Sequence, residues 1–269
     1  MTKEIQINGI SLTSKRWNLE YLPEGIPKKR GNNLTIPFMD GARWDKKSFD
    51  QRTDNLNLWV LPKDENGSLV EGKTEAEQLE ENIEYLKQLF GVSGLITIDK
   101  KMNDGTWRTA KAEIVDTLEF ERKNETDRHR VFSVGLQFPD PFWYAATQEI
   151  ETFTPNAVSY ETTHQNPGTA ENRKMQIKLT GGLTNPKIEN TTTGVFLKLN
   201  DTITTGTTVT IDTEKFTVTD QAGNNLLNSL IHSGDMAWLS LAAGANDLKI
   251  TTDEAPSGHI EFKYYPAYF

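Results

Sequence analysis

The sequence predicts a mainly β protein with two domains: an α+β N-terminal domain that holds one long helix, and an antiparallel β-sandwich at the C-terminus. Short segments of alternating apolar and polar residues recur along the 269-residue chain, as expected of half-buried strands. Residues 74–90 have the periodicity of an amphipathic helix instead. The composition also changes near residue 147: of the 29 Lys and Arg residues, 21 lie in residues 1–145 and 8 beyond. We therefore expect domains at residues 1–145 and 146–269.

The composition excludes several classes of protein. The formal net charge of −9 argues against specific nucleic-acid binding, which needs clustered Lys and Arg to contact phosphates. The chain has no cysteine, so disulfides, thiolate zinc sites and cysteine nucleophiles are excluded. No apolar run reaches the roughly 20 residues of a membrane-spanning helix, and the N-terminus lacks the apolar core of a signal peptide. We expect synthesis in the cytoplasm and no membrane insertion.

The first 60 residues are predicted to form strands separated by turns. The stretch EIQINGISL alternates around Asn8-Gly9, which suits a type I′ hairpin turn because both residues tolerate positive φ. WNLEY and NLNLWVL are further alternating strands. Between them, PEGIPKKRGNN is predicted to be a loop. We interpret its cations Lys28, Lys29 and Arg30 as a solvated loop tip, with binding of an acidic partner as the alternative.

The helix predicted over residues 74–90 has signals at both ends. Thr74 and Glu77 match a capping box, in which each side chain bonds the backbone N–H of the other residue. Gly91 suits the C′ position, where a left-handed backbone ends many helices. One apolar stripe, suited to packing on a sheet, is formed by Leu79, Ile83, Leu86 and Phe90. The acidic remainder of the helix is expected to face water.

The stretch LQFPDPFWYAA joins the two predicted domains. Pro139 and Pro141 end the strand RVFSVGLQF, because proline cannot donate to a β ladder. Phe142, Trp143 and Tyr144 follow directly. Three adjacent aromatic residues alternate faces in an extended chain, so they do not form one sugar-binding platform. We interpret them as a packed interface between the domains rather than as an active-site lid or a sugar site.

The sequence shows no pattern of a catalytic, metal or cofactor site. Its four histidines lie far apart, and it has no zinc-protease motif, nucleophile elbow or glycine-rich phosphate loop. We therefore expect no enzyme activity, no metal and no cofactor. HQNPG, which starts at His164, resembles the sugar-binding H-x-N-P-R strand of galectins, but Gly168 replaces the arginine. We interpret Asn166-Pro-Gly168 as a turn.

The C-terminal half contains short strand patterns separated by turns such as Thr205-Gly206 and Asp220-Gln-Ala-Gly223. This spacing is typical of an antiparallel sandwich. The segments predicted as strands are KMQIKL, GVFLKL, TTVTID, KFTVT, AWLSL, DLKITT and HIEFKYY.

Landmarks between residues 132 and 252 resemble the distal tail protein (Dit) family of siphophages. In order, they are Pro139-Asp-Pro-Phe-Trp-Tyr144, Asn166-Pro-Gly168, Asn185-Pro-Lys-Ile-Glu-Asn190 with Thr193-Gly194, Ile211-Asp-Thr213, and Trp238, Leu241, Gly244 and Asn246. The N-terminal half resembles the family through its Ile-Asn-Gly hairpin, its many strands and its single long helix. The resemblance implies a ring-forming N-terminal domain and a galectin-like C-terminal sandwich that projects outward.

For function, the resemblance implies a structural protein of the virion tail tip. Family members assemble as a homo-hexameric ring around a channel, and the ring joins the tail tube protein to the tail-tip (Tal-like) protein of the baseplate. Their peripheral domains can carry receptor-binding proteins for host adsorption, although this chain lacks the long inserts that some relatives use. Two alternatives stay open: a carbohydrate-binding module, and another ring component of a tail-like injection system.

Overall fold

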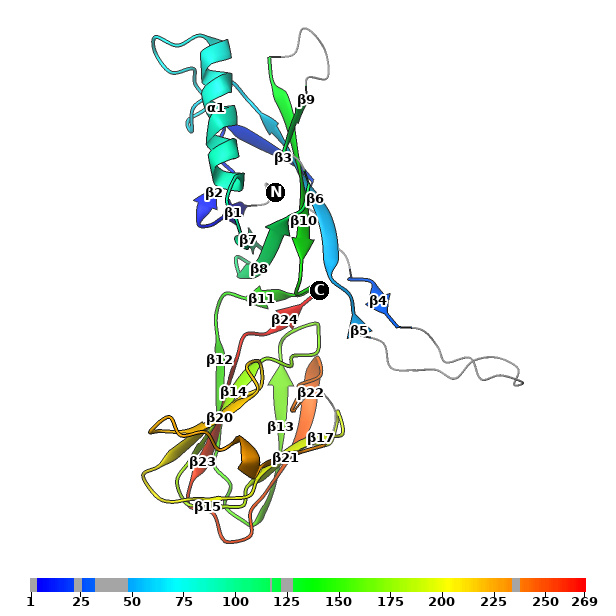
Figure 1. Ribbon diagram of the computed structural model, residues 1–269, viewed down its shortest axis with the longest axis vertical. Coiled ribbons are helices and arrows are strands. Elements are labelled where there is room, and N and C mark those ends of the chain that lie inside the picture. Colours follow the sequence, from blue (N-terminus) through cyan, green and yellow to red (C-terminus); the bar gives the residue numbers. More distant parts are fainter. Residues whose placement is uncertain (1–3, 22–25, 32–47, 117, 122–127, 234–237) are drawn as a thin grey trace, which may run out of the picture. The chain divides into compact units, whose positions relative to one another are not determined.

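The computed structural model of the chain describes residues 4–21, 26–31, 48–116, 118–121, 128–233 and 238–269. The chain divides into two compact units, residues 1–143 with Phe269, and residues 144–268 (Figure 1). Most regular structure is β-strand, and the described residues contain one α-helix. The predicted fold class is confirmed: the protein is mainly β, with one long helix in the first unit and an antiparallel sandwich in the second.

An antiparallel sheet forms the framework of the first unit. The elements of this unit are β1 (Ile5–Ile7), β2 (Ile10–Ser11), β3 (Trp17–Tyr21), β4 (Lys29–Arg30), β5 (Ser48–Phe49), β6 (Arg52–Val60), α1 (Glu75–Phe90), β7 (Ile96–Lys101), β8 (Trp107–Ile114), β9 (Glu119–Glu121) and β10 (Arg130–Phe138). The sheet has the strand order β2-β1-β7-β8-β10-β6-β3, and β9 pairs with β10. A separate two-stranded hairpin is formed by β4 and β5.

The β1–β2 hairpin forms at the predicted Asn8-Gly9 turn. Asn8 and Gly9 have φ values of 49° and 79°, the left-handed conformation that a type I′ turn requires. The Asn8 side chain also ties the hairpin to β7, because its Oδ1 accepts a hydrogen bond from the Thr97 N–H at 2.9 Å. The segment WNLEY is β3, and NLNLWVL lies in β6 except for its last residue, Leu61, as predicted.

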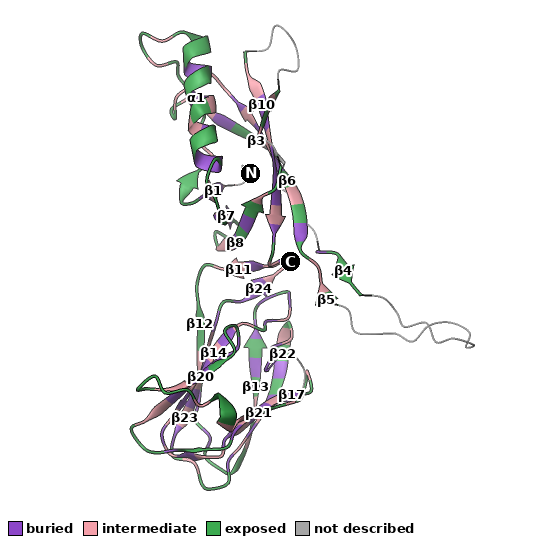
Figure 2. Cartoon of the chain, in the orientation of Figure 1, coloured by how far each residue is buried: buried purple, intermediate pink, exposed green. Residues whose placement is uncertain are grey.

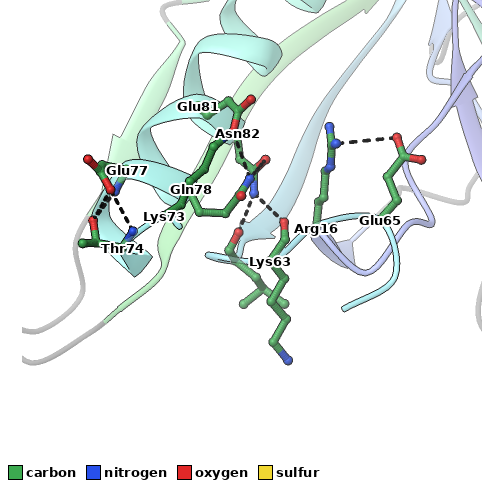
Figure 3. Close-up of polar contacts among 10 residues, drawn as sticks. Arg16, Lys63, Glu65, Lys73, Thr74, Glu77, Gln78, Glu81 and Asn82 are labelled. Carbon is green, nitrogen blue, oxygen red and sulfur yellow. Dashed lines mark hydrogen bonds and ion pairs between the residues drawn. The ribbon is translucent and has the colours of Figure 1, made fainter. Parts of the chain in front are cut away.

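Helix α1 packs one face on the sheet and leaves the other face exposed (Figure 2). The capping box forms at its start: the Thr74 hydroxyl accepts from the Glu77 N–H at 3.3 Å, and Glu77 Oε2 accepts from the Thr74 N–H at 2.7 Å (Figure 3). The buried helix residues are Gln78, Leu79, Asn82, Leu86, Leu89 and Phe90. Two polar residues therefore join the predicted apolar stripe, while Ile83 is only partly buried.

The end of α1 corrects one prediction. Gly91 has a φ of −78°, so it does not adopt the left-handed C′ conformation. Its N–H donates to the Lys87 carbonyl oxygen at 2.7 Å. A Cβ atom at residue 91 would lie 2.5 Å from that same oxygen. Glycine is needed here because the backbone closes tightly on the last helical turn.

The second unit is a sandwich of two five-stranded sheets. Its elements are β11 (Trp143–Ala145, starting at the last residue of the first unit), β12 (Glu149–Phe153), β13 (Ser159–Asn166), β14 (Met175–Thr180), β15 (Leu183–Thr184), β16 (Lys187–Asn190), β17 (Val195–Leu199), β18 (Thr202–Ile203), β19 (Thr208–Asp212), β20 (Thr217–Asp220), the short 3-10 helix η1 (Leu227–Ser229), β21 (Leu230–His232), β22 (Gly244–Thr251), β23 (His259–Tyr264) and β24 (Ala267–Tyr268). The sheet orders are β12-β23-β14-β19-β20 and β13-β22-β16-β17-β21.

The sandwich core is made by side chains that alternate along these strands. On β14, Met175, Ile177 and Leu179 are buried, and on β22, Leu248 and Ile250 are buried. Side chains in a strand point alternately to the two faces of the sheet, so each sheet gives one apolar face to the core. This is the pattern from which most of these strands were predicted.

Residues 238–241 of the segment AWLSL are not a strand, contrary to the prediction, and its first residue, Ala237, lies outside the described residues. Residues 238–241 join no β ladder, and Leu241 makes only an isolated bridge with Asn172. Trp238, Leu239, Ser240 and Leu241 are all buried, whereas a strand at a sandwich surface would turn alternate side chains outward. The alternation in the sequence is therefore misleading here, because the side chains of residues 238–241 are all buried.

Candidate functional site

The predicted interface residues Phe142, Trp143 and Tyr144 lie where the chain passes from the first unit to the second. Strand β10 ends directly before the first of the two prolines, as predicted. Phe142 and Trp143 pack within the first unit, and Tyr144 belongs to the second, where the Lys174 ammonium group lies 5.3 Å from the centroid of its ring. The role of the three residues as an interface between domains stays a prediction.

Trp143 is a core residue of the first unit, with 1% of its surface exposed. Its ring centroid lies 5.8 Å from that of Phe138. Two cations cover these rings: Lys100 Nζ lies 4.2 Å from the Trp143 centroid, and the Arg52 guanidinium lies 4.5 Å from Phe138 and 5.4 Å from Trp143. A desolvated cation–π contact contributes about 2 kcal/mol. Trp143 is therefore held by charge as well as by packing.

Arg52 is almost fully buried beside these rings. Its Nε lies 2.6 Å from Asp54 Oδ2, but the contact lacks the direction of a hydrogen bond, and none of the three guanidinium nitrogens has a hydrogen-bond partner in the part of the chain described. Burial lowers the pKa of Arg52 and raises the pKa of Asp54, while their mutual attraction opposes both shifts. The aromatic faces thus replace part of the lost hydration of the guanidinium.

Phe142 anchors the β4–β5 hairpin. Its ring packs against Phe49 of β5, with centroids 5.5 Å apart and planes at 80°, and against Phe269 at 5.8 Å. Phe49 and Phe269 also pack together, at 5.1 Å. Edge-to-face aromatic pairs contribute about 1 kcal/mol each beyond their buried area. This three-ring cluster of Phe49, Phe142 and Phe269 fixes the base of the hairpin on the first unit.

The cations of the predicted loop tip are exposed, but two of them lie in a strand. Lys29 and Arg30 form β4, which pairs with Ser48 and Phe49 of β5. Lys29 Nζ lies 5.4 Å from the centroid of the Phe49 ring. The loop prediction was wrong for these residues because their partner strand comes much later in the sequence and has no alternation of its own.

Buried asparagines hold the irregular segment at residues 238–242 in the sandwich core. Four such side chains are at most 2% exposed: Asn166, Asn172, Asn190 and Asn246. Asn246 bonds the last residue of this segment with both ends of its amide group. Its Oδ1 accepts from the Ala242 N–H at 2.7 Å, and its Nδ2 donates to the carbonyl oxygens of Ala242 and Gly244 at 2.9 Å each.

Two further asparagines bond the same segment. Asn190 Nδ2 donates to the Ser240 carbonyl oxygen at 2.7 Å and to Asn246 Oδ1 at 2.8 Å. The backbone of Asn172 exchanges two hydrogen bonds with that of Leu241, each 2.8 Å long. Buried backbone groups must be paired. The asparagines therefore supply partners that a β ladder would otherwise provide, and this explains why several of them are among the landmarks of the sequence.

Asn166-Pro-Gly168 forms a turn, as predicted. Asn166 Oδ1 accepts from the Gly168 N–H at 3.0 Å, and its Nδ2 donates to the Ala242 carbonyl oxygen at 3.0 Å. A Cβ atom at residue 168 would lie 2.4 Å from the carbonyl oxygen of Ala267. No arginine fits at this position, so the arginine of the galectin sugar site has no equivalent here.

His164 is a buried bridge between the two sheets. Its ring lies between Glu151 of β12, which contacts Nδ1, and Tyr264 of β23, whose hydroxyl lies 2.7 Å from Nε2. Because a carboxylate only accepts hydrogen bonds, Nδ1 carries the proton toward Glu151. Burial raises the pKa of Tyr264, so its hydroxyl keeps its proton. Both ring nitrogens are thus occupied within the protein.

We expect no galactoside binding at His164, because the ring is 3% exposed and residue 168 offers no side-chain donor. Calorimetric titration of the full chain with galactosides should show no saturable heat, with a sugar-binding galectin as the positive control. Millimolar or tighter binding that His164→Ala abolishes would contradict this expectation.

Within the residues that the structure describes, no three His, Cys, Asp or Glu side chains are grouped so that they could hold a metal ion. No helix in the same residues is long and apolar enough to cross a membrane.

Comparison with known proteins supports the resemblance suggested by the sequence landmarks. Residues 167–268 match the family model described as "Siphovirus-type tail component, C-terminal domain". Comparison with curated proteins gives no match. The fold is similar to the crystal structure of the SPP1 Dit protein, described as a paradigm of the hub adsorption apparatus in phages that infect Gram-positive bacteria. That similarity has a TM-score of 0.68 at 17% identity and covers 100% of both chains.

A second solved structure aligns more weakly. It is a chain from the phage p2 baseplate in its activated conformation with Sr, with a TM-score of 0.43, 10% identity and coverage of 98% of both chains. The resemblance to the distal tail family is confirmed by the family match over residues 167–268, and the similarity to SPP1 Dit extends to the fold of the whole chain.

Proposed function

We propose that this chain, a Dit-like component of a phage tail, is the hub of a siphophage tail tip and assembles as a homo-hexameric ring. In this proposal the ring joins the tail tube protein to the tail-tip (Tal-like) protein, and receptor-binding proteins for host adsorption attach around it. The role is structural and involves no catalysis or cofactor. The protein acts in the virion, at the end of the tail.

One observation carries the proposal: the chain that matches the siphovirus-type tail component at its C-terminus is also similar in fold to SPP1 Dit over its whole length. Residues 167–268 match the C-terminal domain of that family, and the alignment with SPP1 Dit leaves no part of either chain uncovered. The second unit alone is an ordinary sandwich, a fold with many functions. The combination of both units is what favours a hub.

The sheet of the first unit supports ring formation. Its path ends at β2 on one side and β3 on the other, and among the described residues each of these strands pairs with one neighbour only. An unpaired strand edge exposes backbone donors and acceptors, and proteins usually cover such edges. A ring of identical copies covers two different edges of every copy at once.

Removal of the chain from an infecting phage tests the hub assignment. We expect tails without this protein to lack the tail-tip proteins, because the joint between tube and tip is missing, and expression of the chain in trans should restore complete particles. Electron microscopy of the particles gives the readout. Complete, infectious tails formed without the chain would contradict the assignment.

We also propose that the two units are independent domains joined near residues 139–150. The compact units have their boundary between Trp143 and Tyr144. We expect a fragment of residues 144–269 to fold alone, since its core cluster lies entirely within these residues. Circular dichroism and a cooperative thermal transition check this. An unfolded or aggregated fragment, beside a well-behaved full chain, would count against independent domains.

A further inference from the structure

Residues 26–30 form an exposed segment that is both basic and apolar. Lys28, Lys29 and Arg30 are exposed, and none of them forms an ion pair with another residue that the structure describes. Ile26 is 70% exposed, the highest value among the large hydrophobic residues described. The three-ring cluster fixes the base of the hairpin, but a two-stranded hairpin of this size is marginally stable in water. Contact with another surface would bury Ile26 and stabilise the hairpin.

The outer face of α1 has the opposite charge. The helix contains five glutamates and one lysine, a net charge of −4. Two cations outside the helix neutralise only part of this charge: Arg128 pairs with Glu75 at 2.9 Å, and Lys73 pairs with Glu81. Within the helix, Lys87 pairs with Glu84 at 2.6 Å. Glu80 is exposed and has no ion-pair partner within the described residues.

Hydrogen bonds tie the acidic helix to the segment that follows β6 (Figure 3). From its buried face, Asn82 Nδ2 donates to the carbonyl oxygens of Leu61 and Lys63 at 2.8 and 2.9 Å. The side chain of Gln78 in turn donates to Asn82 Oδ1 at 3.3 Å. Because α1 is fixed by polar bonds as well as apolar packing, its glutamates form a surface with a defined geometry.

Both surfaces belong to the first unit, but they cannot meet within one copy. Figure 1 shows α1 and the β4–β5 hairpin on opposite sides of strands β6 and β10. In a closed ring with cyclic symmetry, each contact joins two different surfaces from opposite sides of neighbouring subunits. Complementary charges on opposite sides of one subunit suit such a head-to-tail contact.

The geometry points to a contact in which residues 26–30 of one copy dock on the acidic face of α1 in the next copy. This inference rests on the proposed ring and adds the surfaces that join its subunits. Surface ion pairs are weak one by one, so burial of Ile26 is expected to add apolar contact area to the charge pairs. A nucleic acid is the competing occupant of the basic segment, but three cations in a chain with a net charge of −9 favour an acidic protein surface.

Charge reversal tests the contact in the full-length chain. We expect Lys29→Glu with Arg30→Glu to weaken self-association by about tenfold or more, and Glu80→Lys with Glu84→Lys to do the same, because like charges then face each other. Combining all four changes restores opposite charges and should recover most of the association. Sedimentation analysis at low and high salt measures this, and the wild-type association should weaken with salt.

A matched variant controls for net charge. Reversal of Lys111 and Lys198 changes the total charge equally but touches neither surface, so it should leave self-association unchanged. A ring that forms equally well in every variant would overturn this inference and leave the proposed hub intact. If Lys29→Glu with Arg30→Glu abolished DNA binding and left self-association unchanged, the inference would be overturned, and nucleic acid would be the partner of the basic segment. A chain that shows no self-association at any salt concentration would overturn both the contact and the proposed ring.

Zero-length cross-linking gives an independent readout. A carbodiimide joins a lysine ammonium group to a carboxylate in direct contact, and we expect it to link Lys28 or Lys29 to Glu80 or Glu84. Since the two surfaces lie on opposite sides of one copy, such a link identifies neighbouring copies. Cross-linked rings that contain other subunit links but none between these residues would overturn the inference.

Discussion

Asn246→Ala is expected to lower the free energy of unfolding of the second unit by about 4 kcal/mol, because each buried polar group left without a partner costs roughly 1–3 kcal/mol. The variant removes the acceptor for the Ala242 N–H and the donor for two carbonyl oxygens. It also removes the oxygen to which Asn190 donates. The irregular segment that brings Trp238 into the core would then lose much of its hydrogen bonding.

Thermal and denaturant unfolding of the full chain measures this effect. Asn156→Ala is the matched control, since Asn156 is exposed in the same unit, and a change there should stay within about 0.5 kcal/mol. If Asn246→Ala were as stable as Asn156→Ala, the asparagines would not be what holds residues 238–242 in place.

Trp143→Ala is expected to destabilise the first unit by about 4 kcal/mol, the usual cost of deleting a large buried aromatic side chain. Trp143 is 1% exposed, and its removal also leaves Lys100 and Arg52 without the ring that they cover. A buried cation that loses its aromatic partner adds to the cost of the cavity. The effect should appear as a lower midpoint for the transition of the first unit.

The second unit provides an internal reference for this variant. The transition that matches the isolated fragment of residues 144–269 should keep its midpoint, because Trp143 is not part of that fragment. Trp107→Ala is the control, because it makes the same substitution at a residue that is only partly buried. It should lower the free energy of unfolding by about 1 kcal/mol. Calorimetry of the full chain resolves the two effects. Equal losses for Trp143→Ala and Trp107→Ala would show that Trp143 is not the core residue described here.

Periodicity in the sequence predicted those helices and strands whose apolar side chains all lie on one face. Helix α1 and strands such as β6 and β14 have a clear apolar face, so a few residues suffice to identify them. The hairpin of β4 and β5 could not be found in this way. Its two strands have two residues each and lie far apart in the sequence, and the Phe49–Phe142 contact that fixes it is tertiary.

The alternation of residues along a strand indicates that these polar residues, Asn246 and Arg52, are buried, but their polar character does not. Asn246 alternates in step with Leu248 and Ile250, and all three are buried. Arg52 is likewise in phase with the buried residues of β6. Polar residues at core positions normally mark a strand end or a solvated face, so the sequence alone gives no reason to bury them. Their hydrogen-bond and aromatic partners come from distant segments, which only the folded chain brings together.

The same limit applies to the three adjacent aromatics that first suggested an interface. The alternating faces of the three aromatics and the two prolines before them predicted the end of a strand and a packed interface. They did not predict that Phe142 anchors a hairpin or that two cations lie against Trp143. These contacts depend on Phe49, Lys100 and Arg52, none of which is near them in the sequence.

The number and arrangement of copies of this chain in an assembled tail test the central claim most directly. Cryo-electron microscopy of intact tails, with quantitative mass spectrometry of the same particles, should show six copies in one ring between the tail tube and the tail tip. In that ring, residues 1–143 should line the channel wall and residues 26–30 should lie on α1 of the neighbouring copy. A copy number incompatible with a six-fold ring, or a position away from the joint between tube and tip, would contradict the claim.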